Sequence, residues 1–165
     1  MFHMTPGGVM TIRVLALFSL FLAFQVHAAA LSSPPSSLHP TLSAALCHAA
    51  SEDSALAPQM EAMLETGLIS YDQVGDVLNL DCQSASLLER VVAGHHAENL
   101  EYLAIDLGLD IDQPQVRLGT DIVSFTAFLE ARAAQAEPAL KAFIDEYLTH
   151  FRDIEFNPNL ALSMY

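Results

Sequence analysis

The chain has 165 residues, with 20 Asp and Glu against 6 Lys and Arg, which gives a formal charge of −14. This length favours one domain. The acid excess argues against binding to nucleic-acid backbones or anionic lipid headgroups, because both need clustered Lys and Arg. An apolar content of 52 % excludes a wholly disordered chain. Two cysteines are too few for a disulfide-rich miniprotein or a four-cysteine zinc site.

The N-terminal residues have the features of a secretory signal peptide. Residues 10–13 (MTIR) form a short basic start, residues 14–24 (VLALFSLFLAF) are apolar apart from Ser19, and residues 25–30 (QVHAAA) end in small side chains. A basic start, an apolar run of about a dozen residues and a small-residue site describe such a peptide. Val26 and Ala28 suit the third and first positions before the cut. We therefore predict a signal peptide over residues 1–28, cleaved after Ala28.

The start of this signal peptide has two alternatives. Residues 1–9 (MFHMTPGGV) hold Pro and Gly and no basic residue, so the signal is better formed if translation starts at Met10.

An uncleaved membrane anchor is the alternative to cleavage, but the apolar run is shorter than the roughly 20 residues that a spanning helix needs. Cleavage after Ala28 removes Arg13 and no acidic residue, which leaves 137 residues with a charge of −15. We expect this mature product to be soluble and periplasmic or secreted.

Residues 29–40 read as a Ser/Pro-rich linker. Beyond it we predict an all-α domain over residues 41–155 and a C-terminal tail over residues 156–165. The domain contains a repeat: Met60, Leu100 and Leu140 are spaced by 40 residues, and Pro58 and Pro138 lie two residues before the first and third of them. Proline suits the first turn of a helix, where its missing N–H is not needed. Each of these segments therefore predicts the start of a helix.

Another predicted helix precedes each member of the repeat, which gives three such helices. The apolar stripe of the first is Leu42, Ala45, Leu46 and Ala49, that of the second is Leu87, Leu88, Val91 and Val92, and that of the third is Ile122, Phe125, Phe128 and Leu129. Ser86 with Glu89 forms a capping box before the second stripe. The connectors carry turn signals at Gly67, Gly75, Gly108 and Gly119, and strand signals are weak throughout. Helix pairs at this period predict a short array of about three stacked pairs, and an ordinary all-α bundle is the alternative.

Residues 86–112 (SLLERVVAGHHAENLEYLAIDLGLDID) resemble one ankyrin repeat. Ser86-Leu87-Leu88 falls where that family has Thr-Pro-Leu, Gly94-His95 falls on its inter-helix Gly-His, and the GLDID of residues 108–112 is similar to its closing Gly-Ala-Asp-Val-Asn. The usual ankyrin period is about 33 residues, so the additional residues here fall in the first inter-helix loop and in the connectors. The resemblance implies binding of protein partners through a stacked helical face, with no chemistry of its own.

The two cysteines, Cys47 and Cys82, are predicted to form a disulfide, because disulfides persist in oxidising compartments. The bond would close a loop of about 35 residues and stabilise the fold by about 4 kcal/mol in the chain-entropy description. It would join the first helix pair to the second. A thiol nucleophile and a metal ligand are the alternatives, but the chain has no C-x-x-C.

The tightest group of ligand-type residues is His95-His96 with Glu98. Specific metal sites need three or four converging ligands, and exposed loop histidines are the more frequent explanation. Asp106, Asp110 and Asp112 do not match a calcium-binding loop. No nucleophile elbow, zinc-protease motif or phosphate-binding glycine loop is present. We therefore predict no catalytic residue, no cofactor and no metal, and keep a small periplasmic metal-binding protein or enzyme that uses the His95-His96-Glu98 region as the alternative.

The acidic residues are dispersed along the chain rather than gathered in one block. One interpretation is a solvated surface that keeps an exported protein in solution, and the sharper one is a face that attracts a basic partner. We expect the protein to be an exported interaction module that binds another protein as an accessory, an inhibitor or an immunity factor. If the acidic face attracts its partner, that partner is basic. No nucleic acid and, after signal cleavage, no membrane are expected as partners.

Overall fold

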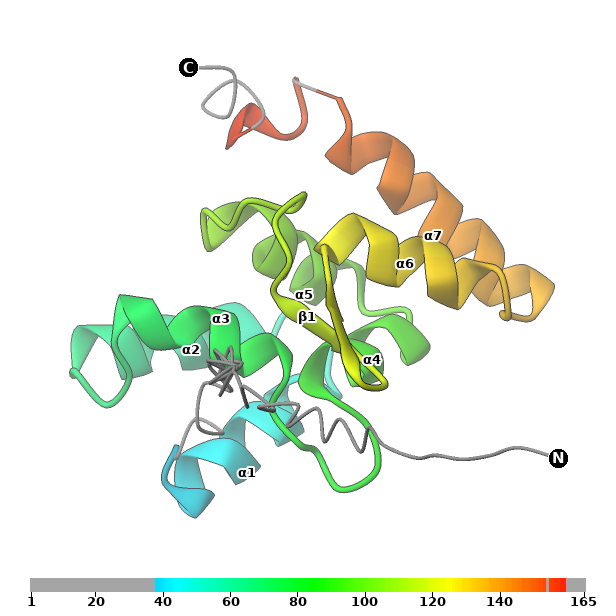
Figure 1. Ribbon diagram of the computed structural model, residues 1–165. Helices are drawn as coiled ribbons and strands as arrows, with labels where there is room; N and C mark the ends of the chain where they lie inside the picture. Colours follow the sequence, from blue (N-terminus) through cyan, green and yellow to red (C-terminus); the bar gives the residue numbers. More distant parts are fainter. Residues whose placement is uncertain (1–37, 154, 160–165) are drawn as a thin grey trace, which may run out of the picture. The chain divides into compact units, whose positions relative to one another are not determined.

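The computed structural model of the chain describes residues 38–153 and 155–159 (Figure 1). The predicted signal peptide with its cleavage site after Ala28, and most of the predicted linker, lie outside the described residues. The described part of the chain is mostly helical, as predicted. Within that part, none of the helices has both the length and the apolar character needed to cross a membrane.

The helices form three pairs, with one further helix in a connector. They are α1 (Pro40–Ala49), α2 (Leu56–Glu65), α3 (Val74–Leu78), α4 (Leu87–Ala93), α5 (Ala97–Glu101), α6 (Phe125–Ala133) and α7 (Pro138–Phe151). A 3₁₀ turn, Tyr71–Gln73, leads into α3, and a π-helical stretch, η2 (Tyr102–Asp106), continues α5. Helix α1 packs against α2, α4 against α5, and α6 against α7.

Side-chain caps fix where the first helices of the second and third pairs begin. The predicted capping box is confirmed: the backbone N–H of Glu89 donates to Ser86 Oγ at 3.1 Å, and the N–H of Ser86 donates to Glu89 Oε2 at 2.7 Å. Ser124 caps α6 in the same way, accepting from the N–H of Ala127 at 3.1 Å. Helix α2 begins at Leu56 rather than at Pro58, but the proline is still in the first turn, where no N–H is needed.

A short hairpin precedes α6, and the sequence did not predict it. Strands β1 (Val116–Leu118) and β2 (Asp121–Val123) pair antiparallel, with Val116 opposite Val123. They turn at Gly119, whose φ of +62° suits glycine. Ile122 was expected in the apolar stripe of the following helix, and this is wrong: it lies in β2 and is 52 % exposed. The Ser124 cap delays the helix until Phe125, and strands of three residues are too short to show a period of two.

The connector between the first two pairs also differs from expectation. Gly75 was predicted to mark a turn, but it lies inside α3. The neighbouring Val74, Val77 and Leu78 are buried, so the helix forms because it contributes apolar side chains to the core. Gly67, with a φ of +68°, does lie at a turn, directly after α2.

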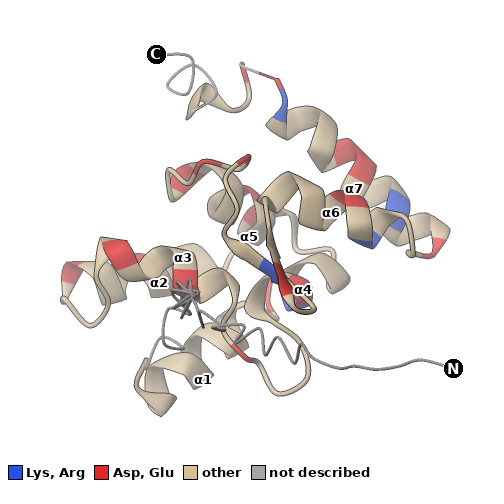
Figure 2. Cartoon of the chain, viewed as in Figure 1, with Lys and Arg blue, Asp and Glu red and all other residues tan. Residues whose placement is uncertain are grey.

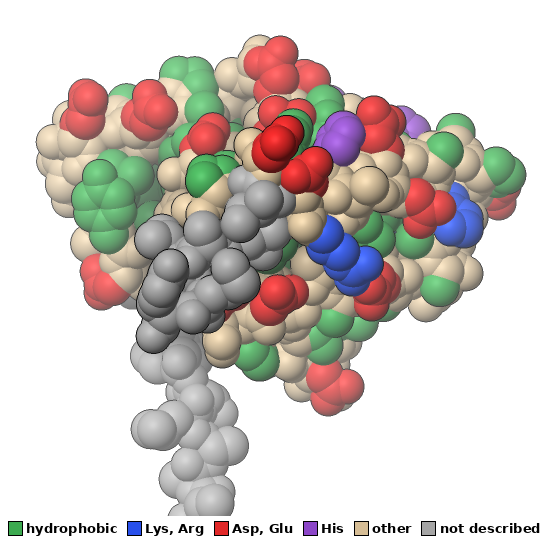
Figure 3. Space-filling view, turned by 90° about the horizontal axis from the view of Figure 1, so that it is seen from above, with side chains coloured by type: hydrophobic (Ala, Val, Ile, Leu, Met, Phe, Trp, Pro, Cys, Tyr) green, Lys and Arg blue, Asp and Glu red, His purple; other side chains and the backbone are tan. Residues whose placement is uncertain are grey.

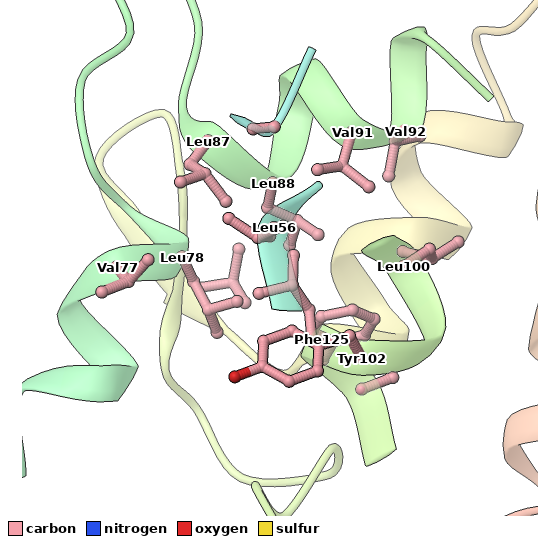
Figure 4. Close-up of a cluster of buried hydrophobic side chains, with 14 of the residues drawn as sticks. Leu56, Val77, Leu78, Leu87, Leu88, Val91, Val92, Leu100, Tyr102 and Phe125 are labelled. Atoms are coloured by element: carbon pink, nitrogen blue, oxygen red, sulfur yellow. The ribbon is translucent and has the colours of Figure 1, made fainter. Parts of the chain in front are cut away.

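One apolar core runs through all three helix pairs. Figure 4 shows how side chains from α2, α3, α4, α5, η2 and α6 converge within it. Its largest fully buried members include Leu46, Leu56, Met60, Leu87, Leu88, Leu100, Leu103, Phe125, Phe128 and Phe151. Burying one such side chain is worth about 1.5–3 kcal/mol, so this core is the main stabilising contribution.

The first residues of the predicted C-terminal tail pack against the last helix. Asn157 is fully buried and donates from Nδ2 to the carbonyl oxygen of Phe151 at 3.1 Å. Asn159 Nδ2 donates to the carbonyl oxygen of Ile105 at 2.9 Å, in η2. The folded body therefore reaches at least to Asn159.

Candidate functional site

The two cysteines lie at disulfide distance, as predicted, with their Cα atoms 5.4 Å apart. Cys47 is on α1, and Cys82 lies in a tight loop before α4, where its N–H donates to the carbonyl oxygen of Ala85 at 2.9 Å. The pair therefore links the first helix pair to the second. The two residues differ in exposure: Cys82 is 1 % exposed, whereas Cys47 is half-buried.

An open hollow of about 470 Å³ lies over the disulfide. Both cysteines line it, together with His48 on α1, Asp81 in the loop and Arg90 on α4. The Arg90 guanidinium donates from Nη1 to Ser51 Oγ at 3.2 Å and from Nη2 to the carbonyl oxygen of Cys82. Both acceptors are neutral, and among the described residues Arg90 forms no ion pair. Within the described part of the chain, a cation that is in no ion pair therefore lines this hollow, together with the carboxylate of Asp81.

Two further hollows continue the same surface. One of about 420 Å³ lies between α4, α6 and the start of α7, where Arg132 forms an ion pair with Glu89. A smaller one of about 270 Å³ shares Asp81 with the first hollow and Glu89 with the second, and reaches Arg117 on β1. We call these three hollows together the grooved face. Figure 2 shows basic residues on the hairpin and beside α4, among the elements that form it.

The residues singled out for metal binding do not form a ligand set. His95 lies in the turn before α5, with its ring edge-on to Phe143 at 5.2 Å between centroids. The His96 imidazole fills the space that a side chain at Gly94 would need. Glu98 donates its backbone N–H to Asp53 Oδ1 at 3.0 Å. Over residues 38–153 and 155–159, the structure holds no group of three or more His, Cys, Asp or Glu placed to bind a metal ion.

A buried polar joint connects the first two helix pairs. Asn99 on α5 is 1 % exposed and accepts a hydrogen bond from the backbone N–H of Leu56 at 3.0 Å. Its Nδ2 donates to the carbonyl oxygens of Glu52 at 2.8 Å and Ala49 at 3.2 Å. Asp53 Oδ1 also accepts from the N–H of Asn99 at 3.4 Å, at the start of α5. Sequence reasoning missed this joint because its partners are distant in the chain.

Two tyrosine hydroxyls lie close to carboxylates of the second helices. Burial, followed by the charges of Glu61 and Asp106 and the nearby Tyr71, raises the pKa of Tyr102 to about 12. The pKa of Tyr147 is also raised to about 12, by burial, then by a hydrogen bond to Glu101 and by the charges of Glu101, Glu146 and Asp53. Both hydroxyls are protonated at neutral pH.

These carboxylates form two groups, with Glu61 and Asp106 near Tyr102 and with Glu101 and Glu146 near Tyr147. We call Glu61, Glu101, Asp106 and Glu146 the outer acidic face; they come from α2, α5, η2 and α7. None of the four is in an ion pair with a Lys or Arg of the described residues. Tyr71, which lies close to Tyr102, is 81 % exposed. Figure 3 shows acidic side chains spread over the visible face and far fewer basic ones.

In the part of the chain that the structure describes, the grooved face and the outer acidic face are thus the candidate functional surfaces. The first carries hollows, the disulfide and arginines, and the second carries carboxylates beside an exposed tyrosine. No protein-family model, curated protein or solved structure matches the chain.

Proposed function

We propose that the mature chain is an exported protein-binding module, which binds a basic protein through the outer acidic face and acts as an accessory, an inhibitor or an immunity factor. The observation that carries this proposal is the charge imbalance of the surface. Ion pairs with Lys or Arg in the described residues engage only Glu89, Glu130 and Asp145 of the 20 acidic residues. The remaining carboxylates are available to attract a cationic partner.

The composition of the outer acidic face supports a protein as the partner. Carboxylates steer a basic protein toward the surface and set its orientation. Tyr71, at 81 % exposed, adds an aromatic ring of the kind that contributes strongly to interface energy. Nucleic acid is a poor alternative, because a surface with this charge repels phosphate.

The contacts between helix pairs support an ankyrin-like array as the scaffold. Asn99 ties α5 to the loop between α1 and α2, and the Tyr147 hydroxyl of α7 donates to Glu101 of α5 at 3.1 Å. The ion pair of Arg132 with Glu89 joins α6 to α4. Each pair thus contacts a neighbour, as repeats in a solenoid do. Export is supported by the disulfide pair, which suits an oxidising compartment, and by the signal-peptide pattern of residues 1–28.

The test compares two triple variants with the same change in net charge. The first removes charge from the outer acidic face: Glu61→Gln, Asp106→Asn and Glu146→Gln. The second removes it from exposed positions elsewhere: Asp121→Asn, Glu137→Gln and Glu155→Gln. Each protein, immobilised with its disulfide intact, is exposed to an extract of exported proteins, and the affinity of any captured protein is measured after purification.

We expect a protein of basic isoelectric point whose affinity falls about tenfold or more for the first triple, whereas the second triple binds nearly as the native chain does. Its affinity should also weaken as salt rises, because exposed charges are screened. An equal loss of affinity in both triple variants would mean that binding depends on net charge alone and not on the outer acidic face. A captured partner that is acidic or neutral, or none at any salt concentration, would contradict the proposal.

A further inference from the structure

The disulfide is asymmetric toward solvent. Both cysteines line the hollow of about 470 Å³, but Cys82 is 1 % exposed whereas Cys47 is half-buried. A thiolate attacks a disulfide along the line of the two sulfur atoms, so access decides which sulfur is attacked. Of the two residues, Cys47 is therefore the more accessible to a thiol that enters the hollow.

The wall of the hollow favours the same direction of attack. When Cys47 is attacked, Cys82 leaves as a thiolate, and a thiol leaves faster when its anion is stabilised. The Arg90 guanidinium is bonded to the carbonyl oxygen of Cys82 itself and has only neutral acceptors. A nearby Arg favours the thiolate over the thiol. Arg90 also attracts an incoming anion, against the opposing charge of Asp81, which lines the same hollow.

We propose that this hollow is a site of thiol–disulfide exchange, at which a small thiol bearing a carboxylate modifies Cys47. The thiolate of the incoming molecule forms a new S–S bond to Cys47 Sγ. The Cys47–Cys82 bond breaks, and its electron pair leaves on Cys82 as a thiolate, which then takes a proton from solvent. The step exchanges one disulfide for another, so it needs no oxidant or reductant besides the thiol.

The size of the hollow sets the class of molecule. Pockets of about 300–1,000 Å³ hold small ligands rather than folded domains, and this one falls within that range. The exchange also separates α1 from the loop that carries Cys82. The link between the first two helix pairs would then rest on non-covalent contacts such as the Asn99 joint.

The experiment treats the mature, disulfide-intact protein with reduced glutathione for short times and traps free thiols with N-ethylmaleimide. Digestion with a glutamate-specific protease cuts at Glu52, between the two cysteines, and mass spectrometry then locates each adduct. We expect glutathione on Cys47 and maleimide on Cys82, in about tenfold excess over the reverse pattern. The reverse pattern, equal amounts of both, or no reaction until the protein is unfolded would overturn the proposal.

Variants of Arg90 test the leaving-group argument. Arg90→Gln removes the charge and should slow the exchange about three- to tenfold, whereas Arg90→Lys keeps the charge and should recover most of the rate. Arg117→Gln is the matched control, because it removes an exposed arginine of β1 that does not line this hollow. Urea unfolding of each variant checks that it is folded. Equal exchange rates in the native protein and its three variants would show that Arg90 has no part in the exchange. A faster exchange in Arg90→Gln would contradict the stabilisation of the leaving thiolate by Arg90.

Discussion

Asn99 accepts a hydrogen bond from the backbone amide of Leu56, a residue 43 positions earlier in the chain. Leu56 is the first residue of α2, so its N–H has no partner within its own helix. Asn99 satisfies that donor from α5, and its own amide group donates to the carbonyl oxygens of Ala49, at the end of α1, and of Glu52, in the loop that follows. The first two helix pairs are thus joined by a buried polar contact as well as by the apolar core.

Replacing Asn99 should destabilise the protein strongly. Asn99→Leu keeps a similar volume but leaves the buried N–H of Leu56 without a partner, and an unmet buried group costs about 1–3 kcal/mol. The carbonyl oxygens of Ala49 and Glu52 each lose one hydrogen bond and keep a backbone donor. We expect a loss of roughly 2 kcal/mol in the free energy of unfolding, measured by urea titration. Asn99→Asp should also destabilise, since a carboxylate repels the carbonyl oxygens of Ala49 and Glu52. Exposed Gln113→Leu is the control, and a loss of similar size there would contradict this argument.

Reduction of the disulfide should lower stability without abolishing the fold. The bond closes a loop with a sequence separation of 35, which corresponds to about 4 kcal/mol in the chain-entropy description. The double variant Cys47→Ala/Cys82→Ala should lose a comparable amount and no longer respond to reductant. Urea unfolding with and without dithiothreitol measures both effects. An unchanged unfolding midpoint after complete reduction would show that the link contributes nothing.

The two serine caps should each contribute a measurable stabilisation. Ser86→Ala and Ser124→Ala remove the acceptors for the N–H groups of Glu89 and Ala127, and each should cost about 1 kcal/mol. Ser84→Ala is the matched control, because Ser84 is exposed and lies outside the helices. If all three substitutions shift the unfolding midpoint equally, the caps are not the cause.

Stability should fall at alkaline pH because of the buried tyrosines. The pKa values of Tyr102 and Tyr147 are raised from 10.0 to about 12, so the folded state holds both protons more tightly than the unfolded state does. Their contribution is fully present below pH 10 and is lost as the pH rises toward 12. The double variant Tyr102→Phe/Tyr147→Phe should lose less stability over that interval, as measured by urea midpoints. An equally steep loss in both proteins would assign it to other groups.

The sequence by itself determined the parts of this protein that depend on local chemistry. The three helix pairs follow from apolar residues at helical spacing, such as Leu87, Leu88, Val91 and Val92, which are all buried. The Ser86–Glu89 capping box follows from residues three apart. The pairing of Cys47 with Cys82 followed from the presence of only two cysteines in a chain whose N-terminal pattern predicts export.

Only the tertiary structure determined which residues, distant in the sequence, come into contact. Local pattern cannot show that Asn99 would bond to Leu56, that Arg90 would reach the carbonyl oxygen of Cys82, or that Cys47 would be the more exposed cysteine. The hairpin of residues 116–123 escaped prediction because its strands are short, and Gly75 lies in a helix because its neighbours are drawn into the core. Sequence therefore specified the three helix pairs and the Ser86 cap, and long-range packing placed the hollow, the polar joint and the surface charges.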